Sequence, residues 1–225
     1  MNGRGRVTTT NLRQLLRGLA VFEGELPRFD HTDTPPAPHE LFTGWLLEVI
    51  RAGVSEPHAM TLSTAGAAGV PSARVLILKN ADAAGWQFAA HARSPKGREL
   101  AERPHAALTF YWQPQARQIG VRGPVVAEPS ERSAADFRAR GAGARAEALL
   151  GRQSEPLASP AARDAAVEES LARLEREPDL AAPEWTLYTV RAEAVEFWQG
   201  DRDRRHTRLA YRREADGWRK ELLWP

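Results

Sequence analysis

The 225-residue sequence contains no cysteine. This absence excludes disulfide bonds, thiolate nucleophiles, zinc–thiolate sites and iron–sulfur clusters, and it fits a protein of the reducing cytoplasm, which is the location we expect. Lysine is also scarce: it occurs only at positions 79, 96 and 220, and arginine carries the rest of the positive charge. The sequence has no apolar run of about 18 residues, so we expect no membrane-spanning helix and no membrane partner. No apolar stretch of signal-peptide length occurs near the N-terminus.

Common catalytic and binding motifs are missing as well. The histidines show no paired spacing typical of metal ligands, so we expect no metal site. No Walker loop, no Gly-x-Ser-x-Gly elbow and no glycine-rich turn after a strand occurs, which disfavours nucleotide hydrolysis, serine-based acyl transfer and ordinary nicotinamide binding. A formal net charge of only +2 does not indicate nucleic-acid binding. We therefore expect a small-molecule substrate and no nucleic-acid partner.

Several segments have the apolar spacing or the start signals of helices. Apolar residues at helical spacing predict an amphipathic helix over residues 42–50 that ends at Gly53. Ser94-Pro95 and Ser159-Pro160 are typical helix starts, because serine caps the first turn and proline fits into it. Further helices are predicted over residues 11–19, 130–140 and 144–150.

Strand patterns account for most of the remaining chain. The runs 58–64, 73–79 and 86–91 predict a three-stranded antiparallel meander. Further strands are predicted over residues 106–112, 117–128, 185–198, 209–214 and 218–223. Seven or eight strands, many of them consecutive and with few crossover helices, favour an α+β fold built on an antiparallel β-barrel with flanking helices.

The proline content changes near residue 40. Residues 1–40 include four prolines between positions 27 and 38, which predicts an extended arm, and residues 1–10 are expected to be disordered. Residues 41–225 contain no internal repeat and no linker long enough to divide them. We therefore expect a single domain over 41–225 that follows the arm.

The densest set of candidate site residues lies in residues 195–208. An aromatic strand end is followed by a polar loop that carries Arg204, Arg205, His206 and Arg208. Arginine offers a planar fork of donors to phosphates and carboxylates, and histidine exchanges protons near neutral pH. Trp198 beside them supplies a flat apolar wall. These residues suit a flat, anionic ligand, and the alternative interpretation is a solvated basic turn.

Other candidate residues stand at the ends of predicted elements. Arg74 and Lys79 bracket one strand. Lys96 stands in the first turn of a helix, where the helix dipole favours an anion, so a lysine there is locally unfavourable unless an anion is bound. The positions that carry no signal by themselves are Gln118, Arg140, Gln153 and Ser154.

Taken in order, these pieces resemble one family. The motifs are Arg74-Val-Leu-Ile-Leu-Lys79, Ser94-Pro-Lys96-Gly, Arg117-Gln118, Arg152-Gln153-Ser154, Glu196-Phe-Trp198-Gln-Gly, Arg204-Arg-His206-Thr-Arg208 and Leu223-Trp-Pro225. Their order and spacing are similar to those of the pyridoxine/pyridoxamine 5′-phosphate oxidase family, whose members share a flavin-binding split β-barrel. The resemblance covers residues 41–225.

The resemblance implies a homodimer with FMN at the subunit interface. The implied FMN contacts are Arg74, Val75, Leu76, Ile77, Leu78, Lys79, Lys96, Gln118, Gln153, Ser154, Trp198 and Arg208. The implied substrate contacts are Lys79, Arg140, Arg204, Arg205 and His206, of which Arg204 and His206 would be catalytic. The implied reaction is hydride transfer from the substrate to FMN and reoxidation by O2 with release of H2O2. Whether His206 accepts a proton is left open.

The sequence departs from the family where phosphates are held. Pro95 stands in place of an arginine that serves the flavin phosphate. Asp136 and Ala144 replace a tyrosine and a serine of the substrate-phosphate clamp, and an aspartate repels a phosphate. Arg205 replaces an apolar residue. These departures weaken the assignment of pyridoxine 5′-phosphate as the substrate.

Four hypotheses follow. The first is a pyridoxamine/pyridoxine 5′-phosphate oxidase with an altered clamp. The second is an oxidase of the phenazine-biosynthesis type that dehydrogenates a reduced aromatic ring. The third is a non-catalytic flavin or haem binder on the same barrel, and the fourth is a nucleic-acid module that uses the arginine-rich loop.

Overall fold

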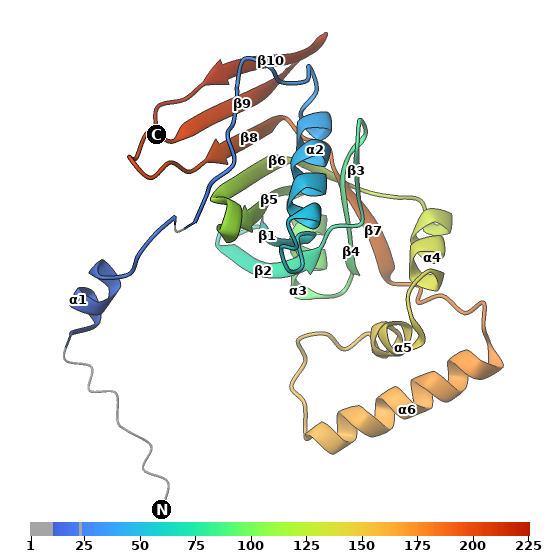
Figure 1. Cartoon of the computed structure of the whole chain (residues 1–225). Coiled ribbons are helices and arrows are strands. Elements are labelled where there is room, and N and C mark those ends of the chain that lie inside the picture. Colours follow the sequence, from blue (N-terminus) through green and yellow to red (C-terminus); the bar gives the residue numbers. More distant parts are fainter. Residues whose placement is uncertain (1–10, 23) are drawn as a thin grey trace, which may run out of the picture.

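The computed structural model describes residues 11–22 and 24–225, so the disorder predicted for residues 1–10 lies outside the described residues. The described chain forms six α-helices, one 3₁₀ helix and ten strands (Figure 1). The helices are α1 (Leu12–Arg17), α2 (Pro38–Arg51), α3 (Pro95–Glu102), η2 (Gln113–Gln115), α4 (Ser130–Arg138), α5 (Ala142–Leu150) and α6 (Pro160–Arg176). The strands are β1 (Ala59–Ala65), β2 (Pro71–Ile77), β3 (Asn80–Asp82), β4 (Gly85–His91), β5 (His105–Trp112), β6 (Arg117–Ala127), β7 (Trp185–Val190), β8 (Ala194–Gln199), β9 (Thr207–Glu214) and β10 (Gly217–Leu222).

The strands form one curled antiparallel sheet. Its main path runs β10-β9-β8-β6-β5-β1-β2, while β7, β4 and β3 branch from β6. Strand β6 belongs to both parts, because its residues 117–122 pair with β8 and its residues 125–127 pair with β7. The shared strand lets the sheet fold around the core as a half-barrel (Figure 1).

The predicted meander is correct for its first two strands and wrong for the third. β1 pairs with β2, but β4 pairs with β3 and β7. The short strand β3 lies in the segment between the predicted strands 73–79 and 86–91, and it occupies one edge of β4. Between β2 and β3 the backbone N–H of Leu78 donates to His58 and that of Lys79 donates to Gln87, so the chain passes there from one part of the sheet to the other.

Helix α2 lies across the sheet and completes the aromatic core (Figure 1). It begins at Pro38, earlier than the apolar pattern alone predicts, because proline fits the first turn of a helix. The fully buried ring of Phe42 lies 4.9 Å from that of Phe110. The ring of Trp45 lies 5.2 Å from that of Phe197. The apolar face predicted for this helix is confirmed at Phe42, Trp45 and Val49, which are buried, whereas Ile50 is 51% exposed.

Helices α3 and α6 begin where their serine caps predict. Ser94 Oγ accepts a hydrogen bond from the Gly97 N–H at 3.3 Å and starts α3, and Ser159 Oγ accepts from the Ala162 N–H at 3.2 Å and starts α6. α5 packs against α6 and α4 packs against β7, so the three helices form a layer beside the sheet (Figure 1). Among the described residues, no helix is both long enough and apolar enough to span a membrane.

Candidate active site

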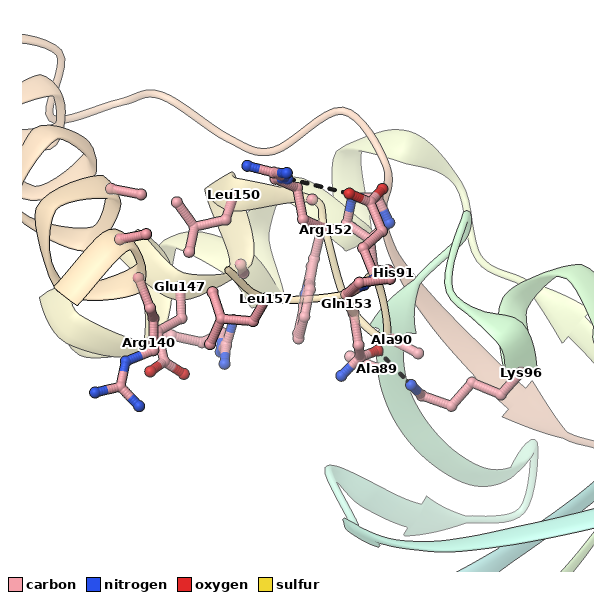
Figure 2. A pocket seen from close by; sticks show the side chains of 18 of the residues that line it. Ala89, Ala90, His91, Lys96, Arg140, Glu147, Leu150, Arg152, Gln153 and Leu157 are labelled. Carbon is pink, nitrogen blue, oxygen red and sulfur yellow. Dashed lines mark hydrogen bonds and ion pairs between the residues drawn. The ribbon is translucent and has the colours of Figure 1, made fainter. Parts of the chain in front are cut away.

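The first group of site residues, here the β2–α3 group, consists of Arg74, Leu76, Lys96 and Gln153. Arg74 donates to the hydroxyls of Thr64 and Ser72. Lys96 Nζ donates to Gln153 Oε1 over 2.5 Å, which joins the first turn of α3 to the loop after α5 (Figure 2). The fold thus brings together three of the predicted cofactor residues from three distant segments.

The charge of this group is only partly balanced. Arg74 lies 3.3 Å from Glu99 Oε2. Burial acts to raise the pKa of Glu99, but hydrogen bonds from Thr64 and Ser72 and the charge of Arg74 lower it overall. Lys96 is only 6% exposed. Burial, followed by the nearby charge of Arg74, lowers the pKa of Lys96 to about 8.

The buried ammonium group of Lys96 has an amide oxygen as its one hydrogen-bond partner among the described residues. The charge of Glu99 favours the ammonium but does not cancel the effect of burial. A buried charge without a direct ion pair is costly, and an anion beside Lys96 would relieve that cost. The β2–α3 group is therefore suited to bind an anion.

A cavity of about 580 Å³ opens beside this group. Its walls include Leu76, Ala89, Ala90, Lys96, Arg140, Gln153 and Trp185 (Figure 2). Ala89 and Ala90 were not among the predicted site residues. Their signal in the sequence is weak, because it consists only of two small residues in a strand that otherwise has large ones. In the structure, these small side chains leave room for the cavity beside β4.

The loop after α5 separates that cavity from a smaller one of about 440 Å³. Ser154, with a φ of +72°, lines the smaller cavity, together with Arg93, Arg98 and Arg152. Arg93 and Arg98 flank the α3 start and were not predicted as site residues. No short-range pattern distinguishes them from the other 29 lysines and arginines of the chain.

A third set of residues, here the Asp136 cluster, consists of Lys79, Asp136, Arg140 and Trp185. Lys79 lies beyond the end of β2, and its Nζ is 3.1 Å from Asp136 Oδ1. Asp136 Oδ2 accepts a hydrogen bond from Trp185 Nε1 at 2.8 Å. Both carboxylate oxygens of Asp136 are therefore occupied, and Lys79 is already paired.

Arg140 stacks on the same tryptophan. Its guanidinium carbon lies 4.1 Å from the centre of the Trp185 ring. Burial lowers the pKa of the Arg140 guanidinium, while the charges of Asp136 and Glu147 act in the opposite direction. Within the described part of the chain, its buried Nη1 atom has no hydrogen-bond partner. Ala144, on α5, is exposed and offers no polar side-chain atom.

The fourth set, here the β8–β9 group, consists of Gln118, Trp198, Arg204, His206 and Arg208. Trp198 stands opposite Gln118 on one side and Arg208 on the other in the strand register, so these three share one face of the sheet. Arg208 pairs with Glu196 at 2.9 Å and donates to the Trp224 carbonyl at 2.7 Å. The predicted loop and strand residues are thus neighbours in space.

His206 has a defined hydrogen bond within this group. Its Nδ1 accepts from the backbone N–H of Asp201 at 3.0 Å, so the neutral ring carries its proton on Nε2. The imidazole lies 5.0 Å from the Trp198 ring and 5.7 Å from the Phe22 ring of the arm. Nε2–H is therefore a donor beside an aromatic wall.

The two predicted arginines of this loop are both exposed. Arg204 adopts a left-handed φ of +61°. Arg205 pairs with Asp203 at 2.9 Å and lines a groove between the loop and arm residues 24–31. The structure therefore does not bring Arg205 to the cavity lined by Arg140 and Lys96.

The β2–α3 and β8–β9 groups do not meet within one chain. β2 is one edge of the main sheet path, whereas the second group lies on β6, β8, β9 and the loop between β8 and β9, so β5 and β1 separate the two groups. Among residues 11–22 and 24–225, no hydrogen bond, ion pair or aromatic contact joins the two groups. Val75 in β2 is 66% exposed and Trp224 is 93% exposed, so apolar surface is left open beside both groups.

Comparison with known proteins shows what the chain is similar to. Residues 46–199 match the pyridoxamine 5′-phosphate oxidase family, and residues 185–225 match the pyridoxine 5′-phosphate oxidase C-terminal dimerisation region. A pyridoxine/pyridoxamine 5′-phosphate oxidase of Thermosynechococcus vestitus is 41% identical over 201 residues, which cover 88% of this chain and 93% of that protein. A protein of the same name from Rubrobacter xylanophilus is 41% identical over 190 residues, which cover 84% and 88%.

Two solved structures share the architecture. PhzG from Burkholderia lata, solved in complex with tetrahydrophenazine-1-carboxylic acid, has a TM-score of 0.82 and 30% identity over 90% of this chain and 100% of that one. A pyridoxamine 5′-phosphate oxidase-related, FMN-binding protein of Nostoc punctiforme has a TM-score of 0.66 and 19% identity over 84% and 98%, which is a likeness of fold. The predicted α+β split barrel is confirmed, and the dimerisation region supports a homodimer.

Proposed function

The chain belongs to the pyridoxamine 5′-phosphate oxidase family and is an FMN-dependent oxidoreductase, and on this premise we propose that it is an oxidase whose FMN and substrate lie between two copies of the chain. When bound, FMN supplies the redox chemistry, which is hydride uptake from the substrate carbon and reoxidation by O2 with release of H2O2. The protein residues bind and orient both molecules.

The β2–α3 group fits the phosphate of FMN. A phosphate monoester carries nearly two negative charges and is held best by several charge-assisted donors. Arg74 and the buried Lys96 supply such donors, with the amide of Gln153 beside them. Leu76 lines the same cavity and offers an apolar contact to a ring.

The β8–β9 group would complete the site from the partner chain. This proposal rests on one observation: β5 and β1 separate the two groups, so one chain holds both halves of a site but does not join them. A symmetric dimer brings the two groups of different chains together twice. In each site, Gln118, Trp198 and Arg208 would then contact the flavin of the other chain.

The residues on the substrate side would position the ring. Arg204 would bind an anionic or carbonyl group, and His206 would donate through Nε2–H, because its Nδ1 is occupied by the Asp201 N–H. A donor at this position polarises the substrate. The hydrogen bond therefore favours His206 as a donor over His206 as a proton acceptor.

Two substrate classes are supported by different observations. The 41% identity to proteins named pyridoxine/pyridoxamine 5′-phosphate oxidase favours a phosphorylated pyridine. The Lys79–Asp136 ion pair favours a ring without a phosphate. Lys79 is one of the two cations that would bind a substrate phosphate, and Asp136 already engages it.

The full-length protein would be titrated with FMN and then mixed anaerobically with each candidate substrate. We expect FMN uptake, flavin bleaching by at least one substrate, and stoichiometric H2O2 when air is admitted. Bleaching by pyridoxine 5′-phosphate would select the first class, and bleaching only by a reduced aromatic acid would select the second. A protein that takes up no FMN contradicts the proposal, and FMN uptake without bleaching by any substrate would support a non-catalytic binder.

A further inference from the structure

We propose that Asp136 is a specificity-determining residue that closes the phosphate-binding end of the substrate site and leaves Arg140 to bind a single carboxylate. This inference rests on the proposed function, because it concerns the substrate of the same site. The Asp136 cluster carries the argument through its contacts, its net charge and the one donor that it leaves without a partner.

Asp136 is held in place on both of its oxygens. Oδ1 lies 3.1 Å from Lys79 Nζ, and Oδ2 accepts from Trp185 Nε1 at 2.8 Å. Its side chain is only 14% exposed. Rotation of the carboxylate away from an incoming phosphate would break two interactions in a half-buried place, so Asp136 is a fixed feature of the site.

The side chains around Arg140 carry charges of both signs, and Arg163 at the cavity wall also interacts with Glu147. Lys79 and Arg140 are positive, while Asp136 and Glu147 are negative and both act on Arg140. A phosphate with nearly two negative charges would leave the cluster with an uncompensated negative charge. A carboxylate adds only one charge and costs correspondingly less.

Arg140 has the geometry to bind that carboxylate. Its guanidinium is stacked on Trp185 and has no ion pair among the described residues, and its Nη1 lacks a hydrogen-bond partner. A buried donor without a partner calls for an explanation, and the planar guanidinium matches a carboxylate in a two-pronged contact. Trp185 and Leu157 line the same cavity and suit a flat ring.

The test compares ligands that differ only in the phosphate. Pyridoxal 5′-phosphate and pyridoxal would be titrated into the FMN-loaded protein and followed by the change in flavin absorbance. Wild type should bind the two with dissociation constants within about threefold of each other. Asp136→Asn removes one negative charge and retains an acceptor for Trp185. It should tighten pyridoxal 5′-phosphate binding about tenfold or more, because Lys79 becomes free to make one charged hydrogen bond to the phosphate. Asp136→Tyr should act in the same direction.

Two controls separate the charge effect from a general disturbance. Pyridoxal binding should change less than threefold in both Asp136 variants, and Asp179→Asn, an exposed aspartate outside the cluster, should leave both ligands unaffected. Binding of phenazine-1-carboxylate, a flat monocarboxylate, should weaken about tenfold in Arg140→Lys, which keeps the charge and loses the planar fork.

The inference is overturned if wild type binds pyridoxal 5′-phosphate at least tenfold more tightly than pyridoxal, or if neither Asp136 variant changes that ratio. It is also overturned if Arg140→Lys binds the carboxylate as wild type does. Failure of the proposed function would be seen separately, as absence of FMN uptake in the titration that precedes these measurements.

Discussion

Lys96 Nζ lies 2.5 Å from Gln153 Oε1, across 57 positions of sequence and between two elements that otherwise face a common cavity. The contact gives a buried ammonium next to Arg74 a neutral hydrogen-bond acceptor, and the nearby charge of Glu99 offsets the cost of burial only in part. A second cation nearby makes this arrangement costly in the free protein and favourable once a phosphate is bound. We therefore expect the affinity of this site for a phosphate to depend on the protonation state of Lys96, and so on pH.

We expect FMN binding to weaken as the pH rises through about 8. Burial and Arg74 lower the pKa of Lys96 to about 8 in the free protein, and a bound phosphate raises it again, so FMN binds with proton uptake above that pH. The FMN dissociation constant should increase roughly tenfold or more between pH 7.5 and 9.5, as measured by fluorescence titration. Lys96→Met should bind FMN weakly with little pH dependence, whereas Lys220→Met should behave as wild type. A flat profile for wild type would exclude this role of Lys96.

Gly97, directly after Lys96, should be intolerant of a side chain. A Cβ at this position would lie 2.1 Å from the carbonyl oxygen of Ala92, whereas a Cβ at Gly44 in α2 would meet nothing within 4 Å. Gly97→Ala should therefore shift the start of α3, reduce FMN affinity and destabilise the fold by about 1–3 kcal/mol. Gly44→Ala should stabilise it by about 0.5–1 kcal/mol. Urea unfolding of both variants measures the two effects, and equal stabilities would contradict the predicted clash.

Substitution of His206 should distinguish a donor from a base. Gln at this position keeps an N–H donor and Leu does not. We expect His206→Leu to slow anaerobic flavin reduction by about 10- to 100-fold, the range for one hydrogen bond to a charged group, and His206→Gln to lose less. FMN affinity should be unchanged in both, because the ring is assigned to the substrate side. Equal losses in the two variants would argue against the donor role and in favour of proton transfer.

Most elements of the fold could be predicted because their signals are local. The apolar face of α2 and the caps of α3 and α6 depend on residues within one or two helical turns. All three helices form, and α2 begins about one turn earlier than expected. The partner of β4 could not be predicted in this way. Its pairing with β7 joins residues about 100 positions apart, and the turn-like composition of residues 80–85 concealed the short strand β3.

The candidate site was predictable as a set of residues and not as an arrangement. Charge rules indicated that Asp136 disfavours a phosphate, but not that it pairs with Lys79, which is 57 positions away. Arg204 and Arg205 looked equivalent and neither lines the cavity, but Arg205 is paired with Asp203 and lines a separate groove. The separation of the two site groups follows from the order of the strands in the sheet. That order depends on long-range pairing, which the motifs do not encode.

Complementation between two inactive variants tests the shared site most directly. Lys96→Met damages the β2–α3 group and His206→Leu damages the β8–β9 group. If each site takes one group from each chain, a mixed dimer holds one intact site, and random pairing should restore about one quarter of wild-type turnover. A mixture of Lys96→Met with Arg74→Ala, both in the β2–α3 group, should restore none. Recovery of activity in the first mixture and not in the second is the result we expect; absence of recovery in the first mixture, with mixed dimers shown to be present, would contradict a site shared between two chains.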